Sequence, residues 1–420
     1  MRSRGGCATV ELVVAPTNAS TRLTVRSAED ADWPAMALLA ATCFGSFRPH
    51  EVTEMWRTLI PADGAVIACD GDDTGDIVGM SFYLDLRLTV PGGAVLPMAG
   101  VSWVCVSPTH RRRGVLSTMF GELHGRMSKA DYPIAGLEAS EGGIYGRFGY
   151  GQASIDETVT VDRREARLHS DVPDPGGVRV VRPLDHRERL EDIYERWRLR
   201  TPGGLYTPPQ LWDEVFRDRE ESRHGGSPFF VLLHDDGFAF YRVHGDGERK
   251  SVELTKLAAV TGDAYIALWR TLLGLDLMDT VTVHAPPGSL LSYLLTDARL
   301  VRITGTEDGL WLRILDVPAV LAARSYGADL SVVLDVSDGV LGGSGRYALD
   351  IRDGRARCER SEAEPDVYTD LSVLGSLYLG THRASAFAAA NRLRCNDSAV
   401  IARLDAAFAS EVSAQLGFGF

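Results

Sequence analysis

The sequence predicts a multidomain protein of the α+β class, and three observations lead to this prediction. The chain has 420 residues, which is too long for one ordinary core and favours two or three domains. Its composition, 45% hydrophobic and 24% charged, is typical of a globular protein. Short β-rich runs bounded by glycine, proline and aspartate are interspersed with amphipathic helical segments. We expect a poorly ordered N-terminal extension (1–21), two mixed units (22–152 and 153–316) and a C-terminal unit (317–420).

The first unit is expected to begin with a strand and two helical segments. "RLTVRS" predicts a short strand, and Trp33-Pro34 opens the helix that follows, because proline is tolerated in the first turn of a helix. "EMWRTLI" continues in helical form. Three β-rich runs, "GAVIACD", "IVGMSFYLDLRLTV" and "AVLPMAGVSWVCV", are separated by the turn-forming stretches "GDDTGD" and "PGG". These runs predict antiparallel hairpins.

The stretch "VSWVCVSPTHRRRGVLSTMF" predicts a strand, a short turn and a helix. The apolar face of that helix, at 3.6-residue spacing, consists of Val115, Leu116, Met119, Phe120, Leu123 and Met127. Three arginines and Gly114 stand directly before it. A helix N-terminus offers free N–H groups and the positive end of a dipole, and arginines add fork-shaped hydrogen bonds. The turn is therefore predicted to hold a phosphate group.

The rest of the chain repeats similar patterns. "YPIAGLEAS" predicts one more strand of the first unit, followed by the glycine-dense "EGGIYGRFGYG". In the second unit, "RVVRPLDHRERLEDIYERW" predicts a strand and a helix, and "PFFVLLHDDGFAFYRVHGDG" a hairpin that turns at Asp236-Gly237. "SVELTKLAAVTGDAYIALWRTLL" again predicts strand, turn and helix, but "VTGD" replaces the arginines. This second copy is therefore expected to lack the phosphate site.

The C-terminal unit changes character. "LSVVLDVSDG" and "GRYALDIRDGRARCER" predict strands joined by Gly-rich and Asp-Gly turns. "DLSVLGSLYLGTHRASAFAAANRLR" and "DSAVIARLDAAFAS" predict helices, and "VSAQLGFGF" is a tail without periodicity.

Charge and cysteine pattern argue against several functions. The formal net charge of -13 is unfavourable for a nucleic-acid partner and favourable for cationic small molecules. No apolar run approaches the roughly 20 residues that span a bilayer, and the N-terminus does not read as a secretory signal. The six cysteines show neither a CxxC pair nor a histidine cluster. We expect reduced thiols, no metal and a cytoplasmic location, with secretion left open.

The strand, arginine turn and helix resemble the acetyl-CoA motif of the GNAT superfamily of N-acetyltransferases, with Leu116 where that pattern has Gly or Ala. Six stretches resemble the family of the mycobacterial enhanced intracellular survival protein: "DWPAMALLA", "LTVPGGAVLP", "SPTHRRRG", "SEGGIYGRFGYG", "DGLWLRILDVPA" and "LGSLYLGTHRAS". The resemblance implies two tandem GNAT-type folds, of which only the first binds acetyl-CoA, then a sterol-carrier-like α+β domain, assembled as a homohexamer.

The resemblance also implies the residues of the active site. Tyr145 would be the general acid and the C-terminal carboxylate of Phe420 the general base. The residues implied for acetyl-CoA are Val104, Cys105, Val106, Arg111, Arg112, Arg113, Gly114, Val115, Leu116, Ser117, Ser140 and Glu141. The residues expected around the acceptor are Phe44, Ser46, Trp56, Trp103 and Glu138, because tryptophan faces suit sugar rings and cations.

Several of these residues also have simpler interpretations. Tyr145 can pack in a crowded turn, and a terminal segment such as "GFGF" usually frays, although two phenylalanines favour burial. Any one of the acceptor residues can belong to a core. Cys105 fits a small buried apolar residue better than a nucleophile. His110 and His124 lack the spacing of a base or metal ligand and are expected in turns or at the surface.

The resemblance implies that the function is transfer of an acetyl group from acetyl-CoA to several amines of an aminoglycoside or another polyamine. Acyl transfer needs a polarised thioester carbonyl, a deprotonated amine and a proton for the leaving thiolate. Two alternatives stay open. Protein lysines are a second class of acceptor, and a lipid- or sterol-binding module would use "LGSLYLG" to line an apolar cavity.

Overall fold

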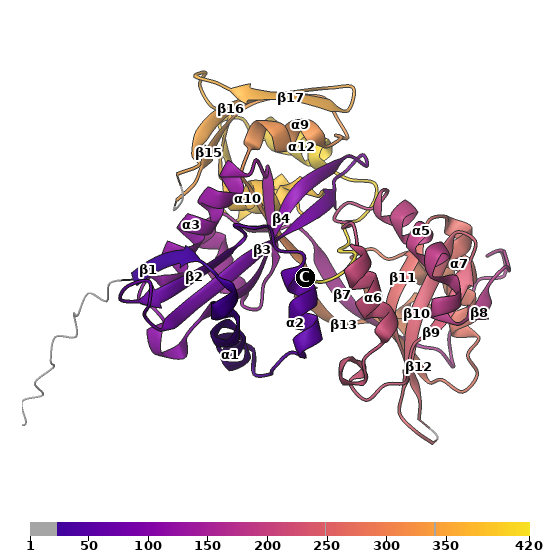
Figure 1. Cartoon of the computed structure of the whole chain (residues 1–420). Helices are drawn as coiled ribbons and strands as arrows, with labels where there is room; N and C mark the ends of the chain where they lie inside the picture. Colours follow the sequence, from indigo (N-terminus) through magenta and orange to yellow (C-terminus); the bar gives the residue numbers. More distant parts are fainter. Residues whose placement is uncertain (1–22, 248, 340–341) are drawn as a thin grey trace, which may run out of the picture.

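The computed structural model describes residues 23–247, 249–339 and 342–420 (Figure 1). The extension predicted for residues 1–21 lies outside the described residues. Three bodies, each built on one β-sheet with helices against it, confirm the α+β class. In Figure 1 the first and second bodies lie side by side, and the third lies across the first. The end of the chain lies between the first two bodies, beside the helices labelled α2 and α6.

The first sheet has the strand order β1-β2-β3-β4-β5-β14-β6. Its strands are β1 (Leu23–Ser27), β2 (Ala65–Asp70), β3 (Ile77–Thr89), β4 (Val95–Val106), β5 (Ile134–Glu138), β6 (Gly151–Gln152) and β14 (Leu310–Ile314). Its helices are α1 (Trp33–Phe44), α2 (His50–Arg57), α3 (Val115–Lys129) and α4 (Gly142–Tyr145). The predicted antiparallel hairpins β2–β3 and β3–β4 are confirmed, and α1 opens at Trp33 as expected.

Helix α3 forms because its apolar residues share one face. Val115, Met119, Phe120, Leu123 and Met127 are buried against β2 and β3, whereas Leu116 is half-buried. Gly114 precedes the helix in a left-handed conformation, with φ of 84°. The strand, turn and helix predicted from the arginine stretch are therefore present.

The second sheet has the order β13-β7-β12-β11-β10-β9-β8. Its strands are β7 (Ile155–Asp162), β8 (Arg179–Val181), β9 (Phe230–His234), β10 (Gly237–His244), β11 (Ser251–Ala259), β12 (Thr280–Ala285) and β13 (Val301–Asp308). Its helices are α5 (Arg187–Arg198), α6 (Pro209–Arg217), α7 (Gly262–Leu273) and α8 (Leu291–Leu294). The turn before α7 carries Thr261, whose hydroxyl accepts the N–H of Ala264 at 3.3 Å. A hydroxyl cap thus stands where the first body has arginines.

The first sheet includes a strand from a later part of the chain. Strand β14 comes from residues predicted for the second unit, yet it pairs with β5 and β6 in the first sheet. The chain therefore passes through the second body and returns to complete the first sheet. This closure holds the two bodies together through backbone hydrogen bonds as well as side-chain packing.

The third sheet has the order β17-β16-β15-β18-β19. Its elements are α9 (Val317–Ala323), β15 (Leu330–Ser337), β16 (Gly345–Arg352), β17 (Arg355–Arg360), β18 (Val367–Asp370), α10 (Leu371–Tyr378), α11 (Ala384–Ala389), β19 (Arg394–Cys395) and α12 (Ser398–Phe408). Every residue of α10 is buried, and the helix packs on β14 and β6 of the first sheet. The "LGSLYLG" segment therefore serves as packing between bodies, which weighs against the lipid-binding alternative.

His124 contradicts its predicted place at the surface. Its side chain is buried, because α3 turns it toward the aromatic residues beneath the sheet. Its Nδ1 donates to the Phe120 carbonyl at 2.6 Å, and its Nε2 accepts the Tyr150 hydroxyl at 2.9 Å. Burial lowers the pKa of His124 to about 4, so the imidazole is neutral at pH 7. His110 does lie in the turn expected for it.

Across the described residues, none of the helices combines the length and apolarity that crossing a bilayer requires.

Candidate active site

The candidate site begins where strands β4 and β5 separate. They pair in parallel from Met98 to Gly100, opposite Ile134–Gly136. Beyond that point β4 keeps its pairing with β3, and β5 continues beside β14. The facing edges of two diverging strands leave backbone N–H and C=O groups available. We call the gap between the diverging strands β4 and β5 the wedge. It can hold an extended polar chain by strand-like hydrogen bonds.

A bulge in β4 divides its side chains between two cavities. Residue 81 of β3 stands opposite both Trp103 and Val104, and Trp103 has the unusual φ of 50°. A bulged residue leaves the ladder and re-aims the neighbouring side chains. As a result Trp103 faces one cavity and Val104 another.

The arginine turn closes one end of the cavity that Val104 lines. Arg112 and Gly114 both have positive φ, 63° and 84°, and a Cβ at Gly114 would meet only open space. The free N–H groups at the start of α3 and the guanidinium groups of Arg111 and Arg112 therefore serve the same cavity.

This cofactor cavity has a volume of about 670 Å³. It collects ten of the twelve residues predicted for acetyl-CoA: Val104, Val106, Arg111, Arg112, Gly114, Val115, Leu116, Ser117, Ser140 and Glu141. Cys105 and Arg113 are not among its lining residues. Cys105 is buried in the core on the opposite face of β4, as expected from the alternation of side chains along a strand. Arg113 is exposed in the turn.

Tyr145, at the end of α4, also lines the cofactor cavity. Its ring packs against Phe120, and 4% of the residue is exposed. Burial raises the pKa of Tyr145 to about 12, although a hydrogen bond with Ser140 opposes the shift. The phenol therefore keeps its proton throughout the physiological range and can donate it.

A larger cavity of about 890 Å³ adjoins the first, and Phe44 lines both. We call it the acceptor cavity. Four residues predicted for the acceptor line it: Phe44, Ser46, Trp56 and Trp103. Glu138 lies instead in a neighbouring inner compartment of about 360 Å³. Phe418 and Gly419 of the C-terminal tail line both the acceptor cavity and this compartment.

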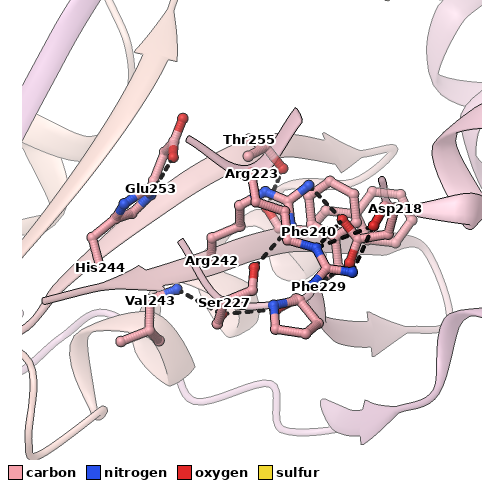
Figure 2. Close-up of polar contacts among 11 residues, drawn as sticks. Asp218, Arg223, Ser227, Phe229, Phe240, Arg242, Val243, His244, Glu253 and Thr255 are labelled. Carbon is pink, nitrogen blue, oxygen red and sulfur yellow. Dashed lines mark hydrogen bonds and ion pairs between the residues drawn. The ribbon is translucent and has the colours of Figure 1, made fainter. Parts of the chain in front are cut away.

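The far wall of the acceptor cavity comes from the second body, which the sequence did not reveal. Glu214, Asp218, Glu221 and Glu253 place four carboxylates there. Figure 2 shows Arg223 and Arg242 directed at Asp218, with Nη2 of Arg242 2.6 Å from Oδ1 of Asp218. Burial acts to raise the pKa of Asp218, but the hydrogen bonds from Arg242 and the Phe229 N–H outweigh it, so the pKa is lowered.

Two other carboxylates of this wall have polar partners. Glu253 lies 2.5 Å from Nε2 of His244, and Glu214 pairs with Arg219. Helix α6 carries both Glu214 and the hydrophobic residues that pack beneath it. The sequence of α6 has the amphipathic pattern of an ordinary surface helix, so it does not predict that the polar face lines a cavity.

The C-terminal tail reaches the apex of the wedge. The N–H of Phe420 donates to Glu138 Oε2 at 2.8 Å. A Cβ at Gly100, the last paired residue of β4, would lie 2.9 Å from Cε2 of Phe420. The backbone N–H and the ring of Phe420 are thus both in contact with the first body, and the tail is not frayed. Phe418 packs against the aromatic residues of α5 and α6, and Gln415, Leu416 and Gly417 line the same compartment as these residues.

Gly417 is expected to be essential for this path. A Cβ there would lie 2.0 Å from Oη of Tyr194, whose hydroxyl is held by the Leu205 carbonyl at 2.7 Å. We expect Gly417→Ala to displace the tail and to speed release of the C-terminal residues by a carboxypeptidase. Gly419→Ala is the matched control, because its Cβ would meet the flexible Glu138 carboxylate at 3.0 Å. Equal digestion of both variants and the parent protein would contradict the path described.

The inner compartment contains two unusual ionisable groups. Burial raises the pKa of Glu138 to about 7, although the hydrogen bond from the Phe420 N–H opposes this shift. The residue still has solvent-accessible surface. Burial lowers the pKa of Lys256 to about 7, and its Nζ lies 4.5 Å from the Tyr194 ring centre. Lys256 also keeps some accessible surface, because it faces the compartment. The sequence offered no signal for Lys256.

In the part of the chain that the structure describes, no three His, Cys, Asp or Glu side chains lie where they could together hold a metal ion.

Comparisons with known proteins agree with this architecture. An acetyltransferase (GNAT) domain model matches residues 24–153, a second acetyltransferase (GNAT) model matches 203–314, and a sterol carrier protein domain model matches 317–416. The crystal structure of Eis1 from Mycobacterium abscessus has a TM-score of 0.84 at 28% identity, covering 95% of this chain and 100% of that chain. The predicted order of two acetyltransferase folds and a sterol-carrier-like domain is confirmed.

Curated relatives give the family. N-acetyltransferase Eis of Mycobacterium tuberculosis is 53% identical over 406 residues, which are 95% of this chain and 100% of the relative. An uncharacterized N-acetyltransferase of Streptomyces coelicolor is 34% identical over 387 residues, 89% of this chain and 93% of the relative. Proteins with this fold use acetyl-CoA as the acetyl donor. The chain therefore belongs to the Eis family of GNAT N-acetyltransferases.

Proposed function

We propose that the protein transfers acetyl groups from acetyl-CoA to several amines of a polycationic acceptor of the aminoglycoside class. The observation that carries the proposal is the acceptor cavity, which Trp56 and Trp103 line together with four carboxylates of the second body. Tryptophan faces suit sugar rings and ammonium groups, and carboxylates attract several amines at once. Its volume of about 890 Å³ leaves room for more than one orientation of a small acceptor.

Acetyl-CoA fits the cofactor cavity by its chemistry. The guanidinium groups of Arg111 and Arg112 and the free N–H groups of α3 would bind the pyrophosphate. The pantetheine arm would lie in the wedge between β4 and β5, beside Val104 and Val106. Its thioester would then be directed toward Phe44, where the two cavities meet.

Proton transfer would use groups at this junction. Tyr145 would donate its proton to the leaving thiolate. The terminal carboxylate of Phe420, which the Glu138 contact holds at the wedge, would accept the proton of the attacking amine, directly or through water. The negative charge of the terminus also attracts the cationic form of the acceptor.

The direct test adds kanamycin or another polyamine to the protein with acetyl-CoA. We expect release of coenzyme A thiol and products that carry more than one acetyl group by mass spectrometry. Lysine peptides are tested in parallel. Turnover with lysine peptides and none with polyamines would replace the proposed acceptor class by protein lysines. Association into a homohexamer is a further prediction, which light scattering on the purified protein measures.

The arginine turn yields a prediction with an internal control. Arg111→Ala and Arg112→Ala are each expected to raise the KM for acetyl-CoA about tenfold or more, because a charged hydrogen bond contributes about 1.5–3 kcal/mol. Arg113→Ala should change this KM far less, since Arg113 does not line the cavity. The kcat at saturating acetyl-CoA should stay near that of the parent protein. An equal effect of all three substitutions would argue against a specific pyrophosphate site.

Glu138 predicts a pH dependence for acceptor binding. Its pKa of about 7 means that the carboxyl is neutral below pH 7 and negatively charged above it. The attraction for a cationic acceptor therefore appears as the pH rises through 7. We expect the ratio of the acceptor KM of Glu138→Gln to that of the parent protein to rise between pH 6 and pH 8. Glutamine keeps an oxygen that can accept the Phe420 N–H, and the ratio cancels the titration of the acceptor itself. A ratio independent of pH would contradict this role.

A further inference from the structure

Two thiols meet beside the cofactor cavity. Cys43, near the end of α1, is half-buried and lines the cavity, and its Sγ lies 3.6 Å from the carbonyl oxygen of Val106. Cys105 lies on the buried face of β4, and its thiol interacts with the thiol of Cys43. Helix α1 packs directly on β4, which brings the two residues together across 62 positions of sequence (105 − 43). Neither residue has a role in the proposed acetyl transfer.

Cys43 lies beside Val106, along which the pantetheine arm is proposed to run. Cys43 precedes Phe44, which marks the junction with the acceptor cavity. Cys43 and Tyr145, the proposed general acid, line the same cavity. A coenzyme A molecule with its pyrophosphate at Arg111 and Arg112 and its pantetheine arm beside Val106 and Val104 would therefore pass Cys43.

The two thiols differ in accessibility. Cys43 lines the cavity, whereas Cys105 is 1% exposed and does not line it. Burial, together with the Cys43 thiol, raises the pKa of Cys105. Since the thiolate is the attacking species, Cys43 is suited to react first with a bound disulfide and Cys105 to follow slowly.

We propose that Cys43 and Cys105 form a redox site for the disulfide of coenzyme A, which inhibits the enzyme by occupying its own cofactor cavity. This inference rests on the proposed acetyl-CoA site. In the first step the Cys43 thiolate attacks one sulfur of the bound disulfide, forms a Cys43–coenzyme A disulfide and expels the other coenzyme A as a thiolate. In the bound coenzyme A disulfide, the second coenzyme A moiety would extend into the acceptor cavity.

The second step involves only the protein. The Cys105 thiolate attacks Sγ of Cys43, the Cys43–Cys105 disulfide forms, and the bound coenzyme A leaves as a thiolate. Coenzyme A disulfide is thus the oxidant, and it is reduced to two molecules of thiol. Both protein forms would block acetyl transfer, the first by filling the cavity and the second by tying α1 to β4 beside it. Dithiothreitol would reverse both.

The experiment incubates the full-length protein with coenzyme A disulfide and follows its mass. We expect one coenzyme A to be added at Cys43, identified by peptide mapping, and then to be lost as the Cys43–Cys105 disulfide forms. Cys105→Ser should accumulate the coenzyme A adduct, and Cys43→Ser should form none. Cys395→Ser, at the half-buried cysteine of the third body, is the matched control and should behave like the parent protein.

Two comparisons distinguish a directed reaction from general oxidation. Acetyl-CoA should protect Cys43, and oxidised glutathione at equal concentration should react with it much more slowly. Modification of other cysteines in preference to Cys43, no protection by acetyl-CoA, or equal reaction with glutathione disulfide would overturn the proposal. The mass readout does not require a known acceptor. Failure of acetyl transfer to polyamines, with the adduct still formed at Cys43, would therefore contradict the proposed acceptor class and leave this site standing.

Discussion

Replacing Tyr145 with phenylalanine is expected to lower kcat by about 10²–10⁴-fold, the range typical of a lost general acid. The reason is geometric and electrostatic. The phenol lines the cofactor cavity, and burial raises its pKa to about 12, so it is protonated at any ordinary assay pH. Without it, the thiolate of coenzyme A must leave unprotonated. The measurement is kcat and KM for both substrates by thiol release.

Two readouts separate this role from a structural one. Acetyl-CoA should bind Tyr145→Phe with unchanged affinity by calorimetry, because phenylalanine keeps the ring that packs on Phe120. Tyr132→Phe is the matched control. The Tyr132 hydroxyl donates to Asp85 at 3.1 Å outside the cavity, so its loss should leave kcat unchanged. A Tyr145→Phe enzyme with normal kcat would remove this residue from the mechanism.

Converting the terminal carboxylate of Phe420 to an amide is expected to cause a comparable loss, about 10²-fold or more in kcat. The amide, made by ligation of a synthetic C-terminal peptide, keeps the Phe420 ring against Gly100 and the N–H that donates to Glu138. It removes only the charge and the basic oxygen. Adding one residue after Phe420 should also impair turnover, since the carboxylate then moves by about 3.5 Å.

The control for this experiment is the same ligation product with a free carboxylate, which should match the recombinant protein. The amide should bind acetyl-CoA normally. If the amide turned over at the normal rate, the base would have to be sought elsewhere. Glu138, whose pKa is raised to about 7, would then be the next residue to test.

The strand, turn and helix of the proposed cofactor site could be predicted from the sequence because they are local. Strand β4, the arginine turn and α3 follow one another within residues 95–129, and each is determined by short-range patterns. The apolar spacing predicts the helix, and Gly114 permits the left-handed turn before it. Ten residues predicted for acetyl-CoA accordingly line one cavity.

The second body shows what local sequence patterns cannot predict. Its strand, turn and helix around Thr261 were predicted, and so was the absence of arginines. The sequence did not predict that α6 and β11 supply part of the carboxylate wall of the acceptor cavity. A helix or strand that faces another body has the same sequence pattern as one that faces solvent. The pairing of β14 with β5 in the first sheet was not predicted either, because strand pairing between distant segments leaves no periodic signal in the sequence.

Taken by itself, then, the sequence determined the class of fold, the order of the three bodies and the arginine turn between β4 and α3. Only the tertiary structure decided which distant residues meet. Phe420 contacts Glu138 across 282 positions, and Cys43 meets Cys105 between a helix and a strand. It also placed His124 in the core. The physical reason is that helices and turns arise from neighbours in sequence, whereas cavities, shifted pKa values and paired thiols arise from burial between elements that packing brings together.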